Sequence, residues 1–193
     1  MRTDIQATVA RGSRWRSARA LCLVLLVILL TLAHPASRAA ANDAERATKA
    51  KFLYQLTRYV TWPEAAHETP DAPVVIGVVD DTLLADTLRS IVSGKKVRGR
   101  SVAIVAITGT EDPAVHLLFL PEAGRGSLRR RAHRHQEGTV LTVAEEFDFP
   151  ELGGDVGIEF IDGRISFSIN RRKVTRGDFS ISSKLMRLAS EVQ

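Results

Sequence analysis

The chain has 193 residues, of which 45% are hydrophobic and 25% charged, with 27 Lys and Arg against 22 Asp and Glu. The whole excess of positive charge lies before residue 42, so this balance gives no support to nucleic-acid binding by the remainder. The single cysteine, Cys22, lies in the same N-terminal stretch, and the rest of the chain has no residue for disulfide or thiol chemistry.

Residues 1–41 have the residue order of a secretory signal peptide. Five arginines precede an apolar run at residues 20–30, and small residues follow between Ala36 and Ala41. The apolar run is shorter than the roughly 20 residues that a membrane span needs. We therefore predict a cleaved export signal, with an uncleaved N-terminal anchor as the alternative. The mature part, residues 42–193, is predicted to be one domain, because it contains no repeats or low-complexity linker.

The mature part is predicted to open on a helix that ends before Trp62. Asn42 and Asp43 can cap this helix, and apolar residues recur along it at helical spacing as far as Val60. The unbroken apolar run Val74–Val79 then predicts a short strand that is buried on both faces.

A helix and three further strands are predicted after this strand. Asp80 and Asp81 can cap the helix, and Gly94 ends it. A strand, a helix and a strand of these lengths form a right-handed parallel crossover, which predicts a mainly parallel sheet. The further strands are predicted at residues 102–107, 115–120 and 139–143, with a polar helix at residues 127–136.

An antiparallel hairpin is predicted around Asp162-Gly163. Apolar residues alternate with polar or small ones on both sides of this dipeptide, and Asp-Gly favours a two-residue turn because Gly tolerates a positive φ. Such a turn predicts three apolar pairs on one face of the hairpin, Phe160 with Ile165, Ile158 with Phe167, and Val156 with Ile169.

The last predicted element is a helix from about Ser182 to Val192, whose apolar stripe would cover the hairpin. The predicted fold class is α/β, a sandwich with a mainly parallel central sheet, helices on both faces and an antiparallel C-terminal hairpin.

Several segments of the chain, in order, carry a resemblance to a known family. The first is Lys51-Phe-Leu-Tyr-Gln-Leu-Thr-Arg-Tyr-Val-Thr-Trp-Pro63, at the end of the opening helix. Together with shorter segments it resembles the YfiR family of exported bacterial proteins over nearly all of residues 47–190. The shorter segments are Ile76-Gly-Val-Val, Leu118-Phe-Leu, Val140-Leu-Thr-Val, Gly153-Gly154, Ile158-Glu-Phe, Phe167-Ser-Ile-Asn170 and Ile181-Ser-Ser-Lys-Leu185.

The resemblance implies a non-enzymatic periplasmic regulator. Such a protein would bind the periplasmic sensor region of an inner-membrane signalling protein, such as a diguanylate cyclase, and restrain cyclic-di-GMP synthesis. Members of the family often carry cysteines that form disulfides, and this chain departs from that pattern because it has no cysteine after Cys22. The alternative is a periplasmic small-molecule-binding protein without a fixed membrane partner. No cofactor is expected, and both a homodimer and a small-molecule effector stay open.

Two places are expected to carry the function. The first is the basic loop after the hairpin, because loops between rigid elements are where binding residues concentrate. The second is a ligand pocket at the carboxyl ends of the parallel strands, near Asp80, Asp81 and residues 108–110. The expected partner-binding residues are Asn170, Arg171, Arg172, Lys173 and Arg176, together with the aromatics Phe147 and Phe149.

No arrangement typical of catalysis or metal binding stands out in the sequence. His133 and His135 are two residues apart, which places them on different faces of a helix. The run Ser182-Ser183-Lys184 is interpreted as a helix cap rather than an acyl-transfer site. The arginines at 129–131 and Arg134 favour a solvated helix face, with binding to anionic lipid headgroups or to an acidic partner surface as the alternative. A hydrolase whose site the sequence does not assemble is a third function class.

Overall fold

The computed structural model describes most of the chain after residue 33. The predicted signal peptide lies largely outside these residues, and its cleavage stays a prediction. Residues 44–193 form one compact unit, which the following description concerns. The described ranges are residues 34–109, 113–121, 123–135, 138–176 and 178–192.

The first described helix, α2 (His34–Arg58), begins earlier than the sequence suggested. Asn42 and Asp43 lie inside it and do not cap it, so that expectation is wrong for the chain as described. Its apolar side chains at Ala50, Leu53 and Leu56 are at most 1% exposed. The predicted amphipathic stripe therefore packs into the core, as helical spacing implies.

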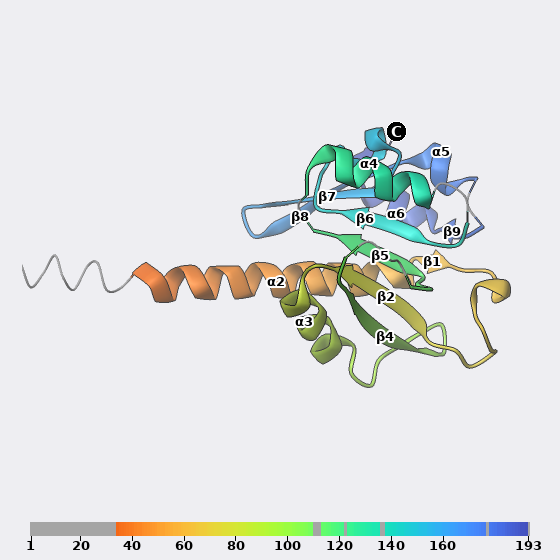
Figure 1. Ribbon diagram of the computed structural model, residues 1–193, viewed down its shortest axis with the longest axis horizontal. Helices are drawn as coiled ribbons and strands as arrows, with labels where there is room; N and C mark the ends of the chain where they lie inside the picture. Colours follow the sequence, from red (N-terminus) through yellow and green to blue (C-terminus); the bar gives the residue numbers. More distant parts are fainter. Residues whose placement is uncertain (1–33, 110–112, 122, 136–137, 177, 193) are drawn as a thin grey trace, which may run out of the picture. The chain divides into compact units, whose positions relative to one another are not determined.

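The strands form an eight-stranded sheet and a separate two-stranded ladder (Figure 1). The order in the large sheet is β10-β8-β7-β6-β5-β2-β4-β3, and its five central strands, β7, β6, β5, β2 and β4, run parallel. The strands are β2 (Val74–Val79), β3 (Lys96–Val97), β4 (Arg100–Ile107), β5 (Leu117–Leu120), β6 (Leu141–Ala144), β7 (Val156–Ile161), β8 (Arg164–Ile169) and β10 (Glu191–Val192), and the ladder pairs β1 (Val60–Thr61) with β9 (Ser180–Ile181).

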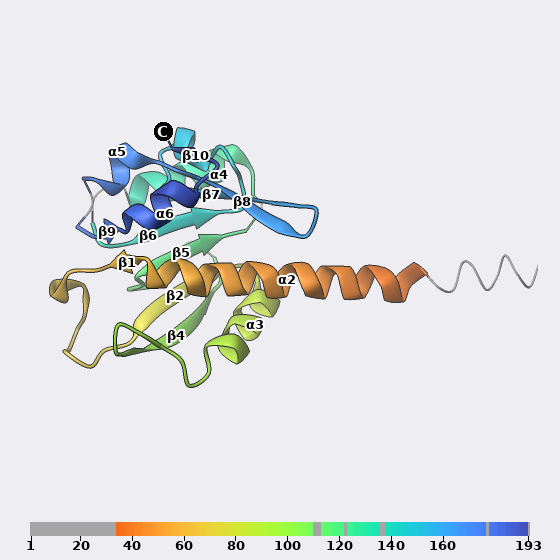
Figure 2. The same ribbon diagram turned by 180° about the vertical axis from the view of Figure 1, so that it is seen from behind.

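Helices cover both faces of the sheet, as Figures 1 and 2 show from opposite sides. Because side chains alternate along a strand, Ile76 and Val78 of β2 join the core under α2, α3 (Thr82–Val92) and α6 (Ser183–Leu188), and Val79 joins the core on the other face. That second core packs against α4 (Arg125–Arg134) and the 3₁₀ helix η2 (Phe149–Leu152). The predicted fold class is confirmed.

The hairpin of β7 and β8 has the predicted register. Val156 pairs with Ile169, Ile158 with Phe167 and Phe160 with Ile165. The turn residues Asp162 and Gly163 have φ values of 49° and 78°, as a two-residue turn of the primed type requires.

The end of the chain differs from the predicted long helix. Helix α6 stops at Leu188, whose side chain is 58% exposed. The Ser190 N–H donates to the carbonyl of Phe167 at 2.8 Å, and β10 then runs parallel to β8. Pairing with the sheet thus replaces the last turns of the expected helix. No helix within the described ranges has both the length and the apolar character to cross a membrane.

Candidate functional site

The two-stranded ladder ties the end of α2 to the segment that enters α6. Val60 pairs with Ile181 and Thr61 with Ser180, in antiparallel register. The Ser182 N–H donates to the carbonyl of Tyr59 at 2.8 Å and extends this connection. Two segments that are 120 residues apart in the sequence are thereby held side by side.

A groove of about 930 Å³ opens next to this ladder. Its apolar walls include Phe179, Ile181 and Met186, and Arg171 and Arg187 supply positive charge to its lining. The groove lies at the amino ends of the parallel strands, because Trp62 precedes β2 and Arg171 follows the antiparallel strand β8. We call this surface the Trp62 groove.

Trp62 lines the groove with an unsatisfied donor. Its side chain is only 7% exposed, and among the described residues no acceptor lies within hydrogen-bond distance of its buried Nε1. Buried tryptophan N–H groups usually find a partner, and leaving one unpaired costs about 1–3 kcal/mol. Nε1 itself is shielded from solvent, so this unpaired donor belongs to the packed interior behind the groove wall.

Two histidines pack beside Trp62. The rings of Trp62 and His116 meet edge to face with centroids 5.5 Å apart, and His67 stacks on His116 at 4.5 Å. The Val75 N–H donates to His116 Nδ1 at 3.0 Å, so the ring proton of neutral His116 lies on Nε2, 3.0 Å from His67 Nδ1. Burial, with the charges of His67 and Arg100, lowers the pKa of His116 to about 4.

Arg100 fixes the loop that follows Trp62. Its guanidinium donates to the carbonyls of Thr69, Pro70 and Ala72 and to Glu64. Because this loop carries His67, the contacts also hold the His67–His116 pair in place. Burial and the charge of Arg100 lower the pKa of His67.

The predicted basic loop contains a short helix, α5 (Arg171–Val174). Asn170 caps it, since its Oδ1 accepts from the Lys173 N–H at 3.0 Å and its Nδ2 donates to the Pro150 carbonyl at 3.2 Å. Asn170 is thus half-buried and committed to the fold rather than free for a partner. The cap orients the cationic residues that follow it.

Lys173 also has a structural role, because its ammonium lies 3.3 Å from Oδ2 of the fully buried Asp155. The same oxygen accepts from the Thr142 N–H at 2.8 Å and from Thr142 Oγ1 at 2.6 Å. Burial raises the pKa of Asp155, against the opposing effects of Lys173 and Thr142. Lys173 therefore anchors α5 to the sheet, which corrects its expected place on a partner surface.

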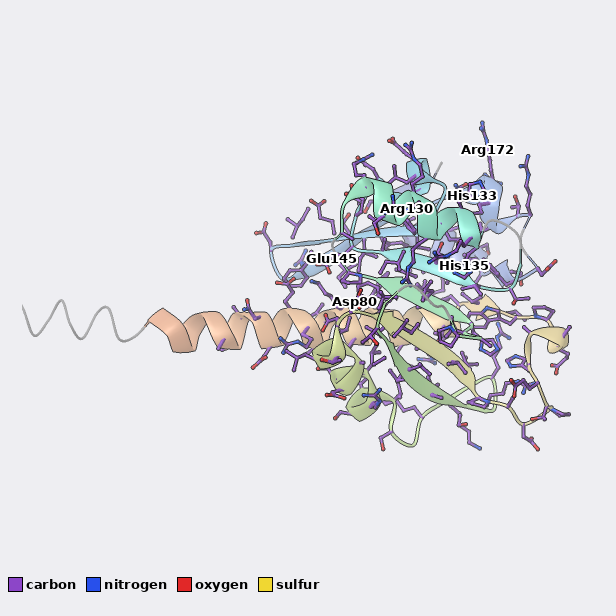
Figure 3. The ribbon with its side chains drawn as sticks, viewed as in Figure 1. Asp80, Arg130, His133, His135, Glu145 and Arg172 are labelled. Atoms are coloured by element: carbon purple, nitrogen blue, oxygen red, sulfur yellow. The ribbon has the colours of Figure 1, made fainter. Side chains whose placement is uncertain are left out.

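The remaining three arginines of the predicted surface are exposed. Arg171 lines the Trp62 groove, and Arg172 and Arg176 line a neighbouring hollow of about 620 Å³. Figure 3 shows Arg172 extending outward from α5. Of the predicted set, these three side chains are the ones that are exposed to solvent.

The two expected aromatics do not share a surface. Phe149 is 0% exposed and begins η2, so the extended segment that would have aligned it with Phe147 does not form. Its ring packs against Gly154, where a Cβ atom would collide with it. Phe147 is half-buried and lines an acidic hollow with Glu145 and Glu146. The placement of Phe149 at a partner surface is therefore wrong.

Asp80 and Asp81 lie at the other end of the sheet, as the Asp80 label in Figure 3 shows. Asp81 Oδ1 caps α3 by accepting from the Leu84 N–H at 2.9 Å. Asp80 has a φ of 50°, and its Oδ1 accepts from the Gly109 N–H at a long 3.4 Å. Both carboxylates have local backbone partners and neither lines the Trp62 groove, so their ligand-binding role stays a prediction; residue 110 lies outside the described ranges.

The basic helix α4 has one buried arginine with a structural contact, and others that are exposed to solvent. Arg131 is 8% exposed and donates to the Gly109 carbonyl, whereas Arg129 and Arg130 are exposed. Arg125 forms ion pairs with Glu146 and Asp148 at 3.2 and 3.6 Å. These contacts agree with the preferred interpretation of a largely solvated helix face.

Sequence reasoning missed most of the groove lining. Phe179, Met186 and Arg187 carry no local motif, because the groove exists only where β1 and β9 pair. Trp62 packs inward, and its unpaired Nε1 could not be foreseen from sequence. The only indication of the groove in the sequence was the position of Trp62-Pro63 at the end of a predicted helix.

The fold and the site together define a class of protein. The described residues form an α/β domain with a mainly apolar groove whose charged lining residues are Arg171, Arg187 and Asp178, a surface suited to binding. Residues 46–190, more than half of the chain, match the YfiR/HmsC-like family, and the chain belongs to that family. Membership supports a periplasmic regulator of cyclic-di-GMP signalling, from a regulatory rather than catalytic family. A search of curated proteins found no match.

Proposed function

We propose that the protein is a periplasmic inhibitor that docks on the periplasmic sensor region of an inner-membrane diguanylate cyclase and restrains it. The docking surface is the Trp62 groove with the exposed arginines of α5. Family membership supports the signalling pathway, and the groove supports the place of contact.

One observation carries this choice of surface. Arg171 is exposed at the lining of a groove whose walls are apolar, and Arg172 follows it on the same short helix. Interfaces combine an apolar centre with arginine-rich contacts, and arginine is among the residues that contribute most to binding free energy. An acidic, partly apolar segment of a sensor domain has the complementary chemistry.

The test is capture from detergent-solubilised inner membrane with the purified protein as bait, followed by mass spectrometry. The expected prey is a membrane protein with a periplasmic sensor segment and a cytoplasmic cyclase domain. Arg171→Glu and Arg172→Glu should each weaken capture at least about tenfold, because charge reversal replaces attraction by repulsion. Circular dichroism should report an unchanged fold, since both side chains are exposed.

The matched control is Arg130→Glu, which makes the same charge change on α4. Arg130 is exposed but lies away from the groove, on the opposite face of the sheet (Figure 3). Capture equal to wild type by this control and reduced capture by the α5 variants would support the surface. Equal capture by all three variants would remove it, whichever prey is recovered.

A second candidate function is binding of a small-molecule effector in the same groove. The groove itself favours it, because small-molecule sites combine an apolar lining with a few polar groups, and this groove has both. The sequence has two tryptophans, and the other, Trp15, lies in the predicted signal peptide. Trp62 fluorescence is therefore a direct readout in a ligand screen of the processed protein. Saturable quenching in the wild-type protein, with a ligand-induced thermal stabilisation that Trp62→Phe loses, would support this function, and no response across the screen would count against it.

A further inference from the structure

Two segments of the chain carry cations but no carboxylates. Residues 46–63 and 87–110 include Lys and Arg at several positions and no Asp or Glu, although residues 42–193 as a whole carry equal numbers of both charges. Lys49, Arg89 and Arg100 form ion pairs with carboxylates outside these segments. Further cations are exposed and have no carboxylate within ion-pair distance among the described residues. They are Lys51, Arg58, Lys95, Lys96 and Arg98.

Lys51 and Arg58 lie on the solvent side of α2. They are seven residues apart, which is close to two helical turns, so their side chains leave the same side of the helix. The core residues Leu53 and Leu56 leave the opposite side. Figure 2 shows α2 in front of the sheet, with the loop between α3 and β4 below its C-terminal half.

The loop between α3 and β4 brings two more cations to the flank of α2. The Lys95 ammonium lies 5.1 Å from the centroid of the Tyr54 ring, a cation–π contact. Arg98 Nε donates to the carbonyl of Val60, just beyond the end of α2, at 3.2 Å. Val97, between the two cations, is 2% exposed and fixes the loop in the core. Segments about 40 residues apart in the sequence therefore hold their cations on one surface.

We call this surface the cationic face; it comprises Lys51, Arg58, Lys95 and Arg98. Lys96 does not belong to it. Side chains alternate along a strand, and the neighbouring Val97 points into the core beneath α2, so Lys96 is directed to the other side of the sheet.

Carboxylates gather on the other side of α2. Figure 3 shows Glu145 across α2 from the loop between α3 and β4. A hollow of about 530 Å³ has several carboxylates in its lining: Glu45, Glu145, Glu146, Asp148 and Glu159. The two kinds of charge are thus separated across α2, and a molecule with this asymmetry is oriented by an external charged surface.

We propose that the cationic face docks on a lipid bilayer with anionic headgroups. Lys and Arg bind headgroup phosphates through Coulomb attraction and hydrogen bonds. Each cation near an anionic bilayer typically raises the partition coefficient about fivefold, so the four together give reversible binding. Because residues 42–193 have no net charge, this attraction depends on the face and not on the charge of the whole domain. The proposal does not rest on the proposed inhibitory function.

The composition of the face favours a bilayer over an acidic protein. Protein interfaces combine polar contacts with an apolar or aromatic centre, whereas a headgroup surface is bound by charge alone. The exposed large apolar side chains of the described residues are Leu83, Ile161 and Leu188, and none lies in the two cationic segments. Tyr54, the aromatic residue beneath Lys95, is buried. Family membership also supports a periplasmic regulator, and the periplasm is bounded by bilayers.

The first test is co-sedimentation of the processed protein with vesicles of phosphatidylethanolamine and phosphatidylglycerol in a ratio of about two to one. The protein should bind saturably at low ionic strength, and raising the salt from about 50 to about 300 mM should weaken binding at least about tenfold. Vesicles of phosphatidylcholine should not bind it. Failure to bind the anionic vesicles, or equal binding to both kinds, would overturn the proposal.

The second test locates the binding surface. Lys51→Gln should lower the partition coefficient about fivefold, and Lys51→Glu, which changes the charge by two units, about 25-fold. Circular dichroism should stay unchanged because the side chain is exposed. The control is Arg130→Glu, the same two-unit change at an exposed position of α4, which should bind within about twofold of wild type. Equal losses in Lys51→Glu and Arg130→Glu would contradict docking through the cationic face.

The competing occupant, an acidic protein, gives a different pattern. A wild-type protein that ignores anionic vesicles, but whose capture of a membrane protein is weakened by Lys51→Glu, would assign the face to an acidic protein and overturn the proposal. Vesicles contain no protein, so their result does not depend on the proposed inhibition. Conversely, loss of capture in Arg171→Glu with unchanged vesicle binding supports two separate surfaces.

Discussion

The two ends of the central sheet use charged residues in opposite ways. At the carboxyl ends of the strands, Asp80 and Asp81 are held by backbone N–H groups of Gly109 and Leu84. At the amino ends, Arg171 and Arg172 are exposed beside the Trp62 groove. The general rule for open α/β sheets places ligands at the carboxyl ends. In this chain the Trp62 groove lies at the amino ends instead.

The difference has a structural cause in the C-terminal segment. After β8 the chain returns to the amino ends of the parallel strands, where α5, β9 and α6 add a wall that a plain crossover sheet lacks. Strand order alone therefore does not predict the Trp62 groove, and the following substitutions test how far the two ends differ.

The largest effect is expected from Lys173→Met. This substitution tests whether Lys173 stabilises the fold while its exposed neighbours on α5 do not. The substitution leaves Asp155 buried without its cationic partner, which typically costs about 3–5 kcal/mol. Chemical denaturation at pH 7 should show this loss in the free energy of unfolding. Because removal of Lys173 raises the pKa of Asp155 further, the loss should shrink as the pH falls and the carboxyl group becomes neutral.

The control for this substitution is the double variant Asp155→Asn/Lys173→Met, which removes both charges from the buried site. Its stability should recover most of the loss, since no unpaired buried charge remains. Arg172→Met, at the exposed neighbour, should change the free energy of unfolding by less than about 0.5 kcal/mol. A Lys173→Met protein as stable as Arg172→Met would mean that Lys173 belongs to the partner surface after all.

An intermediate effect is expected from pH, through the histidine pair beside Trp62. Folding lowers the pKa of His116 from 6.5 to about 4, so the unfolded chain binds more protons between these values. The free energy of unfolding should therefore be fully retained above pH 6.5 and fall by about 2–3 kcal/mol as the pH drops to 4. The lowered pKa of His67 acts in the same direction.

The comparison that isolates His116 is His116→Asn, whose Oδ1 can still accept from the Val75 N–H. This variant should lose stability at pH 7 with the ring contacts, but its stability should depend less on pH between 6.5 and 4. Urea denaturation at several pH values measures both quantities. An identical pH dependence in the two proteins would show that other groups dominate acid destabilisation.

The hairpin and the end of α6 show which parts of the fold can be predicted from the sequence and which cannot. The register of Phe160 with Ile165 followed from one Asp-Gly turn and strict alternation, both local features. The end of α6 did not, because Leu188 and Val192 keep helical spacing while Ser190 pairs with the sheet. Residues 171–176 were expected as a loop, but residues 171–174 form the short helix α5. The burial of Lys173 depends on Asp155, a contact that no local pattern encodes.

A smaller effect is expected at the other end of the sheet, from Asp81→Ala. The side chain caps α3, and losing a cap of this kind costs about 1 kcal/mol. Thermal denaturation should show the loss, and capture of the membrane partner should stay at the wild-type level when measured below the melting transition. Asp81→Asn, which retains an acceptor oxygen, should lose markedly less stability. Reduced partner capture by Asp81→Ala in a folded protein would move function toward the carboxyl ends.

The smallest effect, and the sharpest test of the contrast, is expected from Asp80→Asn. Asn tolerates the left-handed conformation that Asp80 adopts and keeps an oxygen for the Gly109 N–H, so stability should change by less than about 0.5 kcal/mol. The one property that the substitution removes is the negative charge. If this end of the sheet bound a cationic ligand through that carboxylate, ligand-induced thermal stabilisation would disappear in Asp80→Asn. If ligands or partners bind at the Trp62 groove, the same variant responds to them as wild type does, while Trp62→Phe does not. The pair of variants therefore assigns binding to one end of the sheet without depending on the identity of the ligand.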